Sequence, residues 1–113
     1  MDQTFHVAES DEQGLAQISV GGEVDVATAP ELREKLYEVI DRGESPVILD
    51  LLAVTFIDST ALGVLIGAQE RCRGRGTDLR IIVDNPRITK IFGITGLTDL
   101  FSIYPTVAEA VDR

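Results

Sequence analysis

The chain has 113 residues, of which 44% are apolar and 26% charged, a composition that suits one globular domain around a single hydrophobic core. Ten basic against nineteen acidic residues give a formal net charge of -9, which disfavours nucleic acid as a partner because its phosphates would be repelled. We therefore expect one domain over residues 1–113 and a protein partner with a complementary basic patch.

The first elements predicted are two strands that form a hairpin. Residues 4–9 have a strand composition, and residues 15–20 alternate apolar and polar side chains as a half-buried strand does. The link between them, residues 10–14, is polar and contains glycine. This pattern predicts an antiparallel pair at the N-terminus.

A helix and a buried strand come next. Thr28 is predicted to open the helix, with Glu31 three residues later completing a capping box and Pro30 in the first turn, where a missing amide hydrogen costs nothing. Gly43 supplies the left-handed residue that ends the helix. Residues 47–51 are nearly all apolar, which is typical of a strand covered on both faces and implies a parallel sheet.

Residues 51–68 are apolar enough to raise the question of a membrane span. Asp58 would then lie near the centre of the bilayer, at a cost of about 3 kcal/mol. We therefore expect no membrane partner and interpret the stretch as the end of a buried strand followed by a helix over residues 59–73, whose apolar side chains recur at spacings of three and four.

The C-terminal third continues the alternation of strands and helices. Residues 79–83 are predicted as a buried strand, and Asn85 followed by a proline opens a third helix. Residues 101–104 form a last short strand, and Thr106 with Glu109 caps a final helix. The fold class expected is α/β, with the order β-β-α-β-α-β-α-β-α, a mixed, mostly parallel sheet, an N-terminal hairpin and helices packed on the sheet.

Function in such a fold is expected at one edge of the sheet. Right-handed crossovers bring every strand-to-helix junction to the same edge, beyond the carboxyl ends of the parallel strands. We name this edge the rim. The side chains that the sequence places there are Glu23, Asp25, Thr28, Asp58, Ser59, Thr60, Asp84 and Asn85.

The rim has no pattern typical of an enzyme. His6 is the only histidine, it lies on the first strand, and no acid partner for a hydrolytic triad is visible. Acids spread over separate loops are a weak signal for a metal, and no phosphate-binding glycine motif is present. We expect no catalytic residues, no metal and no cofactor.

Ser59 differs from the other rim residues because it begins a helix directly after a buried strand. Its hydroxyl should be exposed, and a phosphate there would add about -1.5 to -2 charges at the surface where a partner docks. The alternative is that Ser59 only caps its helix, the commoner role of a serine in this position. Asp25 and Asp58 are likewise either partner-binding acids or residues that satisfy amides at the start of a helix.

Three segments resemble, in order and spacing, the STAS domain of bacterial anti-sigma factor antagonists, and the actinobacterial members in particular. They are residues 22–25 (GEVD), 56–63 (FIDSTALG) and 91–97 (IFGITGL). The resemblance implies that the unphosphorylated protein binds an anti-sigma factor, itself a serine kinase, and frees a sigma factor. The kinase would then phosphorylate Ser59, the partner would be released, and a serine/threonine phosphatase would reset the switch.

The position of the rim and the resemblance together predict which residues contact the partner, and the resemblance favours this role for Asp58 in particular. The set is Glu23, Asp25, Thr28, Asp58, Ser59, Thr60 and Ala61, with Thr60 as a minor alternative phosphorylation site. Ala61 departs from the glycine usual in the family, and its methyl group is expected to narrow the approach of the kinase. An alternative function is that of the STAS subunits of transporters, which regulate without a phosphorylatable serine, although the Asp-Ser-Thr order argues against it.

The single cysteine, Cys72, cannot form an intrachain disulfide, and no basic segment followed by an apolar signal core is visible at the N-terminus. Both observations favour the cytoplasm as the compartment. Cys72 is expected to be a passive thiol.

Overall fold

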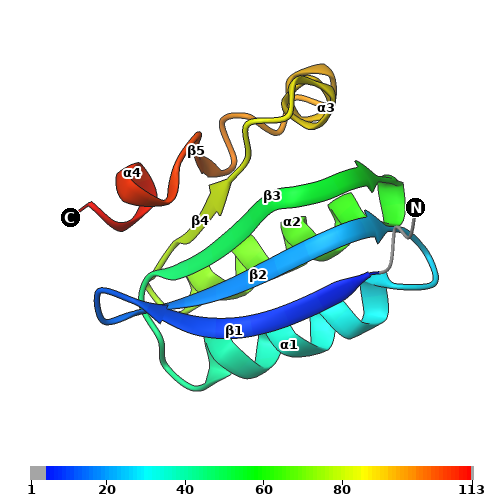
Figure 1. Ribbon diagram of the computed structural model, residues 1–113. Helices are drawn as coiled ribbons and strands as arrows, with labels where there is room; N and C mark the ends of the chain where they lie inside the picture. The colour runs from blue at the N-terminus through cyan, green and yellow to red at the C-terminus, as the bar shows by residue number, and fades with distance from the viewer. Residues whose placement is uncertain (1–4, 113) are drawn as a thin grey trace.

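The computed structural model describes residues 5–112 and has the predicted order of strands and helices (Figure 1). The α/β fold class is therefore confirmed. The elements are β1 (His6–Glu12), β2 (Leu15–Val24), α1 (Ala29–Asp41), β3 (Val47–Ile57), α2 (Ser59–Gly74), β4 (Leu79–Ile82), α3 (Pro86–Ile94), β5 (Ser102–Tyr104) and α4 (Val107–Val111).

The strands form one mixed sheet in the order β1-β2-β3-β4-β5, in which β1 is antiparallel to β2 and the other pairs are parallel. The predicted hairpin turns at Gln13 and Gly14, whose positive φ angles of 57° and 87° suit a two-residue turn between twisted strands. β1 runs on to Glu12, three residues beyond the predicted end, because polar side chains are tolerated on an exposed edge strand. The expected start of this strand at Thr4 lies outside the described residues.

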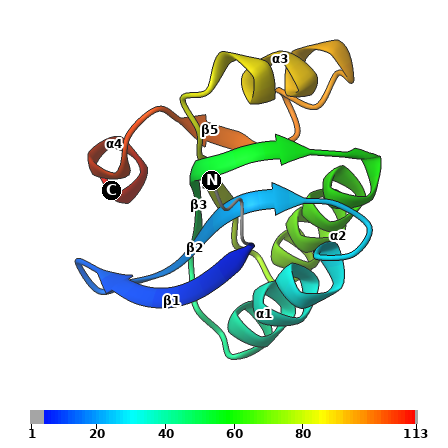
Figure 2. The same cartoon turned by 45° about the vertical axis from the view of Figure 1, so that its right-hand side comes forward.

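The helices cover one face of the sheet and only part of the other face. α1 and α2 lie side by side behind the three long strands, and the main core fills the space between them and the sheet (Figures 1 and 2). α4 covers one end of the opposite face, where Leu15, Ile48 and Ile82 pack on Ala110 and Val111. At the other end of that face, among the described residues, side chains near the carboxyl ends of β2 and β3 are exposed.

β3 runs to Ile57 and is much longer than the predicted strand over residues 47–51, and two bulges interrupt its pairing with β2. Five residues of β2, Ser19 to Glu23, lie opposite seven of β3, Asp50 to Phe56. At the first bulge the Asp50 carboxylate accepts a hydrogen bond from the Leu52 amide at 2.8 Å. Bulges replace strict alternation with a different pattern of buried positions, which is why the sequence pattern ended the strand too early.

β2 also extends beyond its predicted end, through Gly21 and Gly22 to Val24. A Cβ atom added at Gly21 would lie 2.0 Å from Cε1 of His6, so the missing side chain makes room for the imidazole on the neighbouring strand. Glycine inside a strand often marks such a close approach and does not end the strand.

Three predicted helix boundaries are confirmed: the end of α1 at Gly43, the start of α3 after Asn85 and the start of α4 after Thr106. Gly43 has a φ of +96° directly after the last turn of α1. The Asn85 side chain accepts from the Arg87 amide, and the Thr106 hydroxyl accepts from the Glu109 amide. These ends fix how each helix leaves the sheet.

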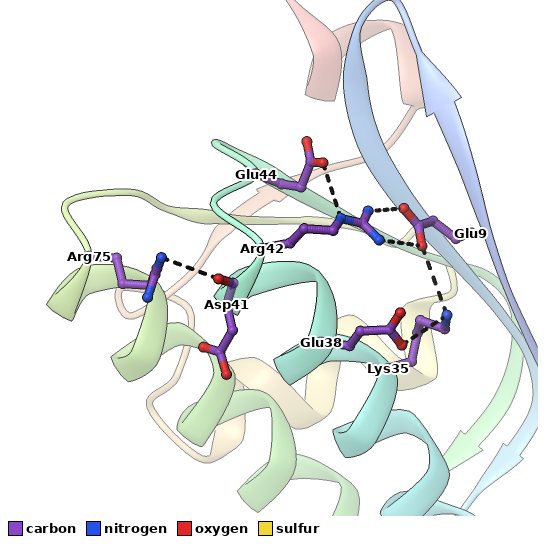
Figure 3. Close-up of polar contacts among 7 residues, drawn as sticks. All are labelled: Glu9, Lys35, Glu38, Asp41, Arg42, Glu44 and Arg75. Carbon is purple, nitrogen blue, oxygen red and sulfur yellow. Dashed lines mark hydrogen bonds and ion pairs between the residues drawn. The ribbon is translucent and has the colours of Figure 1, made fainter.

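The end of the molecule opposite the rim is held by ion pairs between β1 and α1 (Figure 3). Glu9 bonds to Arg42 and also lies 3.9 Å from the ammonium group of Lys35. Arg42 contacts Glu44 as well. The hydrogen bond from Arg42 lowers the pKa of Glu9 below its usual value, against the opposing effect of desolvation.

Candidate functional site

Asp58 caps α2. Its backbone is extended, with φ -113° and ψ -174°, and its Oδ1 accepts a hydrogen bond from the Ala61 amide at 2.9 Å. The interpretation of Ser59 as the cap of this helix is therefore wrong, and the helix-start role belongs to Asp58. The Asp58 amide also donates to the carbonyl oxygen of Val24 at 3.2 Å, which ties the start of α2 to the end of β2.

Ser59 and Thr60 occupy the first two positions of α2, and both residues are exposed. Within residues 5–112, neither side-chain hydroxyl is engaged in a hydrogen bond. The hydroxyl of Ser59 is therefore accessible from solvent in the folded domain, and the α2 cap does not depend on it.

The loop between β2 and α1 is held by Asp25 and Thr28. Asp25 Oδ1 accepts from the amides of Ala27 at 2.9 Å and Thr28 at 3.1 Å. The Thr28 hydroxyl donates to the Glu23 carbonyl at 2.9 Å and accepts from the Asp25 amide at 2.9 Å. Thr28 makes no side-chain bond to an amide of α1, so the predicted capping box is wrong. Its hydroxyl bonds the preceding loop instead.

Large apolar side chains of the β2–α1 loop, β3 and α3 are exposed, and sequence analysis missed them. Val26, at the tip of the Asp25–Thr28 loop, is 70% exposed, and Phe56, two residues before Asp58, is 49% exposed. Phe56 pairs with Glu23 across β2 and β3, so the two side chains lie on the same face of the sheet. Ile94 at the end of α3 is 73% exposed. Val26 and Phe56 each lie two residues from the Val24–Asp58 hydrogen bond, and exposed apolar side chains that lie close together are a signal for protein docking.

The remaining residues predicted at the rim differ in how exposed their side chains are. Glu23 and Asp84 are exposed, whereas Asn85 is partly buried and caps α3. Ala61 is fully buried, and its methyl group belongs to the main core. Its side chain therefore offers no surface to a docked partner. The sequence does indicate that Ala61 is buried, because it lies three residues before Val64 and four before Leu65 and so shares the inward side of α2 with them.

The rim carries exposed acidic and apolar side chains together with the exposed residue Ser59. Among residues 5–112, no group of three His, Cys, Asp or Glu side chains is arranged to hold a metal ion. None of the helices in this part of the chain combines the length and hydropathy that a membrane span requires.

Comparison with known proteins shows the family to which the fold and sequence correspond. Residues 8–110 match the family model of the STAS domain. An anti-sigma-B factor antagonist of Staphylococcus epidermidis is 38% identical over 87 residues, which are 77% of this chain and 81% of the relative. The crystal structure of an anti-sigma factor antagonist from Mycobacterium paratuberculosis has a TM-score of 0.90 at 29% identity, over 98% of this chain and 94% of that chain. The resemblance inferred from sequence is thus confirmed, with a mycobacterial protein among the matches.

The fold is shared beyond these antagonists. A sulfate transporter family protein from Wolinella succinogenes has a TM-score of 0.77 at 23% identity, over 90% of this chain and 85% of that chain. At this identity the match shows a common fold alone, and a shared fold does not imply a shared function.

Proposed function

Because the chain belongs to the STAS domain family, we propose that it is an anti-sigma factor antagonist that releases its partner when Ser59 is phosphorylated. In the unphosphorylated form the domain, residues 1–113, binds an anti-sigma factor that is also a serine kinase and so frees a sigma factor. A serine/threonine phosphatase removes the phosphate and restores binding. The protein acts in the cytoplasm as a binding protein, without catalysis of its own.

The observation that carries this proposal is the unused hydroxyl of Ser59. Asp58 supplies the cap of α2, so a kinase can modify Ser59 without removing a bond on which the helix depends. The exposed side chain is also accessible without unfolding. The names of the curated relatives support the antagonist role.

The phosphate is expected to act on the interface more than on the fold. Helix N-termini stabilise nearby anions, although the Asp58 carboxylate would oppose a second negative group. A docked partner would cover the apolar side chains of Val26 and Phe56 near Ser59. A dianion placed beside such a contact has to lose hydration when the partner docks, which costs several kcal/mol unless it is paired.

The test uses the anti-sigma factor of the same bacterium, purified separately, and isothermal titration calorimetry. Ser59→Asp is expected to weaken binding at least about tenfold, equivalent to about 1.4 kcal/mol, whereas Ser59→Ala binds like the unmodified protein. Ser10→Asp, which places the same charge on the exposed edge strand β1 outside the predicted contacts, is the matched control and should leave the affinity unchanged.

A second measurement addresses the modification itself. Incubation with the anti-sigma factor and ATP, followed by mass spectrometry, should show one phosphate on Ser59 and none on the Ser59→Ala protein. Absence of that phosphate, together with full affinity of Ser59→Asp, would contradict the proposal.

A further inference from the structure

The basic side chains of the described residues are almost all paired. Arg113 lies outside residues 5–112, and nine lysines and arginines remain. Lys35, Arg42 and Arg71 pair with carboxylates, Arg73, Arg75 and Arg80 donate to backbone carbonyls, and Arg33 lies over the ring of Tyr37. The side chains of Arg87 and Lys90 make no such contact within residues 5–112. Both belong to α3.

These two cations share one face of α3 with an exposed isoleucine. Arg87, Lys90 and Ile94 are spaced by three and four residues, so they lie along one side of the helix. All three are exposed, and Ile94 is 73% exposed. Ile88 and Phe92 face the core instead. We call Arg87, Lys90 and Ile94 the α3 stripe.

The helix that carries the α3 stripe lies close to the rim (Figure 2). α3 packs against β3, whose end leads into Ser59. Figure 2 shows α3 alongside the carboxyl half of β3, with the end of α3 directed toward the side where β3 meets α2. α3 and the end of β3, which carries Phe56 and leads into Ser59, are thus neighbouring elements of the fold.

We propose that the α3 stripe is a second part of the docking surface, and that the protein that docks at the rim presents carboxylates around an apolar patch to it. The inference rests on the proposed function. The chain has nineteen acidic residues, yet none pairs with Arg87 or Lys90 within the described structure. A partner carboxylate would supply the missing counter-charge, and Ile94 would supply the adjoining apolar contact.

The arrangement of charge would also orient the partner. The rim offers acidic side chains such as Glu23 and Asp58, whereas the α3 stripe offers two cations. A partner that presents cations to the rim and carboxylates to the α3 stripe fits in one orientation. The reversed orientation brings like charges together. The α3 stripe thus contributes to the choice of partner among related anti-sigma factors.

The experiment compares two double variants with equal changes in net charge, using the purified anti-sigma factor of the same bacterium. Arg87→Glu/Lys90→Glu reverses the α3 stripe, and Arg73→Glu/Arg75→Glu reverses two cations at the end of α2 far from the rim. The first is expected to raise the Kd at least about tenfold and to weaken its dependence on salt. The second should change the Kd less than about twofold. Far-UV circular dichroism verifies that both remain folded.

The outcomes separate the inference from the proposed function. Equal affinities for the two double variants, with Ser59→Asp still weakened, would overturn the role of the α3 stripe and leave the phosphorylation switch intact. Absence of binding by the unmodified protein would overturn both. Self-association or binding to anionic vesicles that is lost in Arg87→Glu/Lys90→Glu, at an unchanged Kd for the anti-sigma factor, would assign the stripe to another occupant and overturn the inference.

Discussion

The carboxylate of Asp58 and the amide of Ala61 are joined by a hydrogen bond of 2.9 Å, which closes the first turn of α2 across Ser59 and Thr60. The structural and the regulatory duties at this junction thus belong to adjacent residues. Asp58 holds the helix, and Ser59 remains available for modification.

This division predicts different stabilities for variants at positions 58 and 59. Asp58→Ala removes the cap and should lower the free energy of unfolding by about 1 kcal/mol, whereas Asp58→Asn retains a capping oxygen and should lower it less. Ser59→Ala should change it by under about 0.5 kcal/mol. Urea denaturation provides the measurement. A loss in Ser59→Ala as large as in Asp58→Ala would show that the hydroxyl supports the helix after all.

Ala61→Gly tests the expectation that the methyl group at this position narrows the approach of a kinase. The methyl group is buried in the core, so its removal should lower the free energy of unfolding by about 1–2 kcal/mol through helix propensity and lost packing. The initial rate of Ser59 phosphorylation should be unchanged at a temperature where both proteins are folded. A faster rate in the glycine variant would instead support the steric expectation.

Cys72 is expected to report on unfolding. It is fully buried, and burial, with a smaller effect of the Asp78 carboxylate, raises the pKa of its thiol from 9.0 to about 11. Modification by a thiol reagent at about pH 8 should therefore be slow in the native protein and rapid in urea. Fast native labelling, at the rate of an exposed thiol peptide, would show that α2 does not protect the side chain.

The raised pKa of the Cys72 thiol is also expected to lower the free energy of unfolding at alkaline pH. Because the folded pKa lies above the unfolded one, the unfolded state loses its proton first, and the free energy of unfolding decreases between about pH 9 and pH 11. Cys72→Ala removes this contribution. The difference in stability between the two proteins, measured in urea at several pH values, should narrow across that window.

The ion pair of Glu9 and Arg42 is expected to contribute to the free energy of unfolding in a way that is lost in acid. The pKa of Glu9 is lowered in the folded state, chiefly by the hydrogen bond from Arg42, so the pair stabilises the fold above the unfolded pKa. This contribution is lost as the pH falls through the folded pKa. Arg42→Met should therefore destabilise the protein more at about pH 7 than at about pH 3. Glu9→Gln should show the same trend, and an equal effect at both pH values would contradict it.

Most of the fold was predictable because its signals are local. Asn85 before a proline and Thr106 before Glu109 mark helix starts through short-range bonds, and the structure has those bonds. Thr28 shows the limit of such signals. Its spacing to Glu31 fits a capping box, but the hydroxyl bonds the Glu23 carbonyl instead, a choice made by the path of the loop.

The site was predicted only in part. Ser59 and Asp58 are adjacent polar residues before a helix, and sequence alone gives no reason why one caps and the other does not. The exposed side chain of Phe56 was missed because the strand was ended at residue 51, so no face was assigned to residue 56. Sequence alone does not show that Arg87 and Lys90 lack partners within residues 5–112, because the partners of surface cations come from segments distant in the chain.

The two bulges in β3 make the length of that strand as important as its composition. Neighbouring residues of a strand point to opposite sides, so deletion of a single residue between Asp50 and Phe56 would reverse the orientation of the remaining residues up to α2. Phe56 would then turn inward and Ile57 would turn outward. The start of α2, which carries Ser59, would be displaced relative to the sheet. Natural variants should therefore tolerate substitutions in this segment far better than changes in the number of its residues.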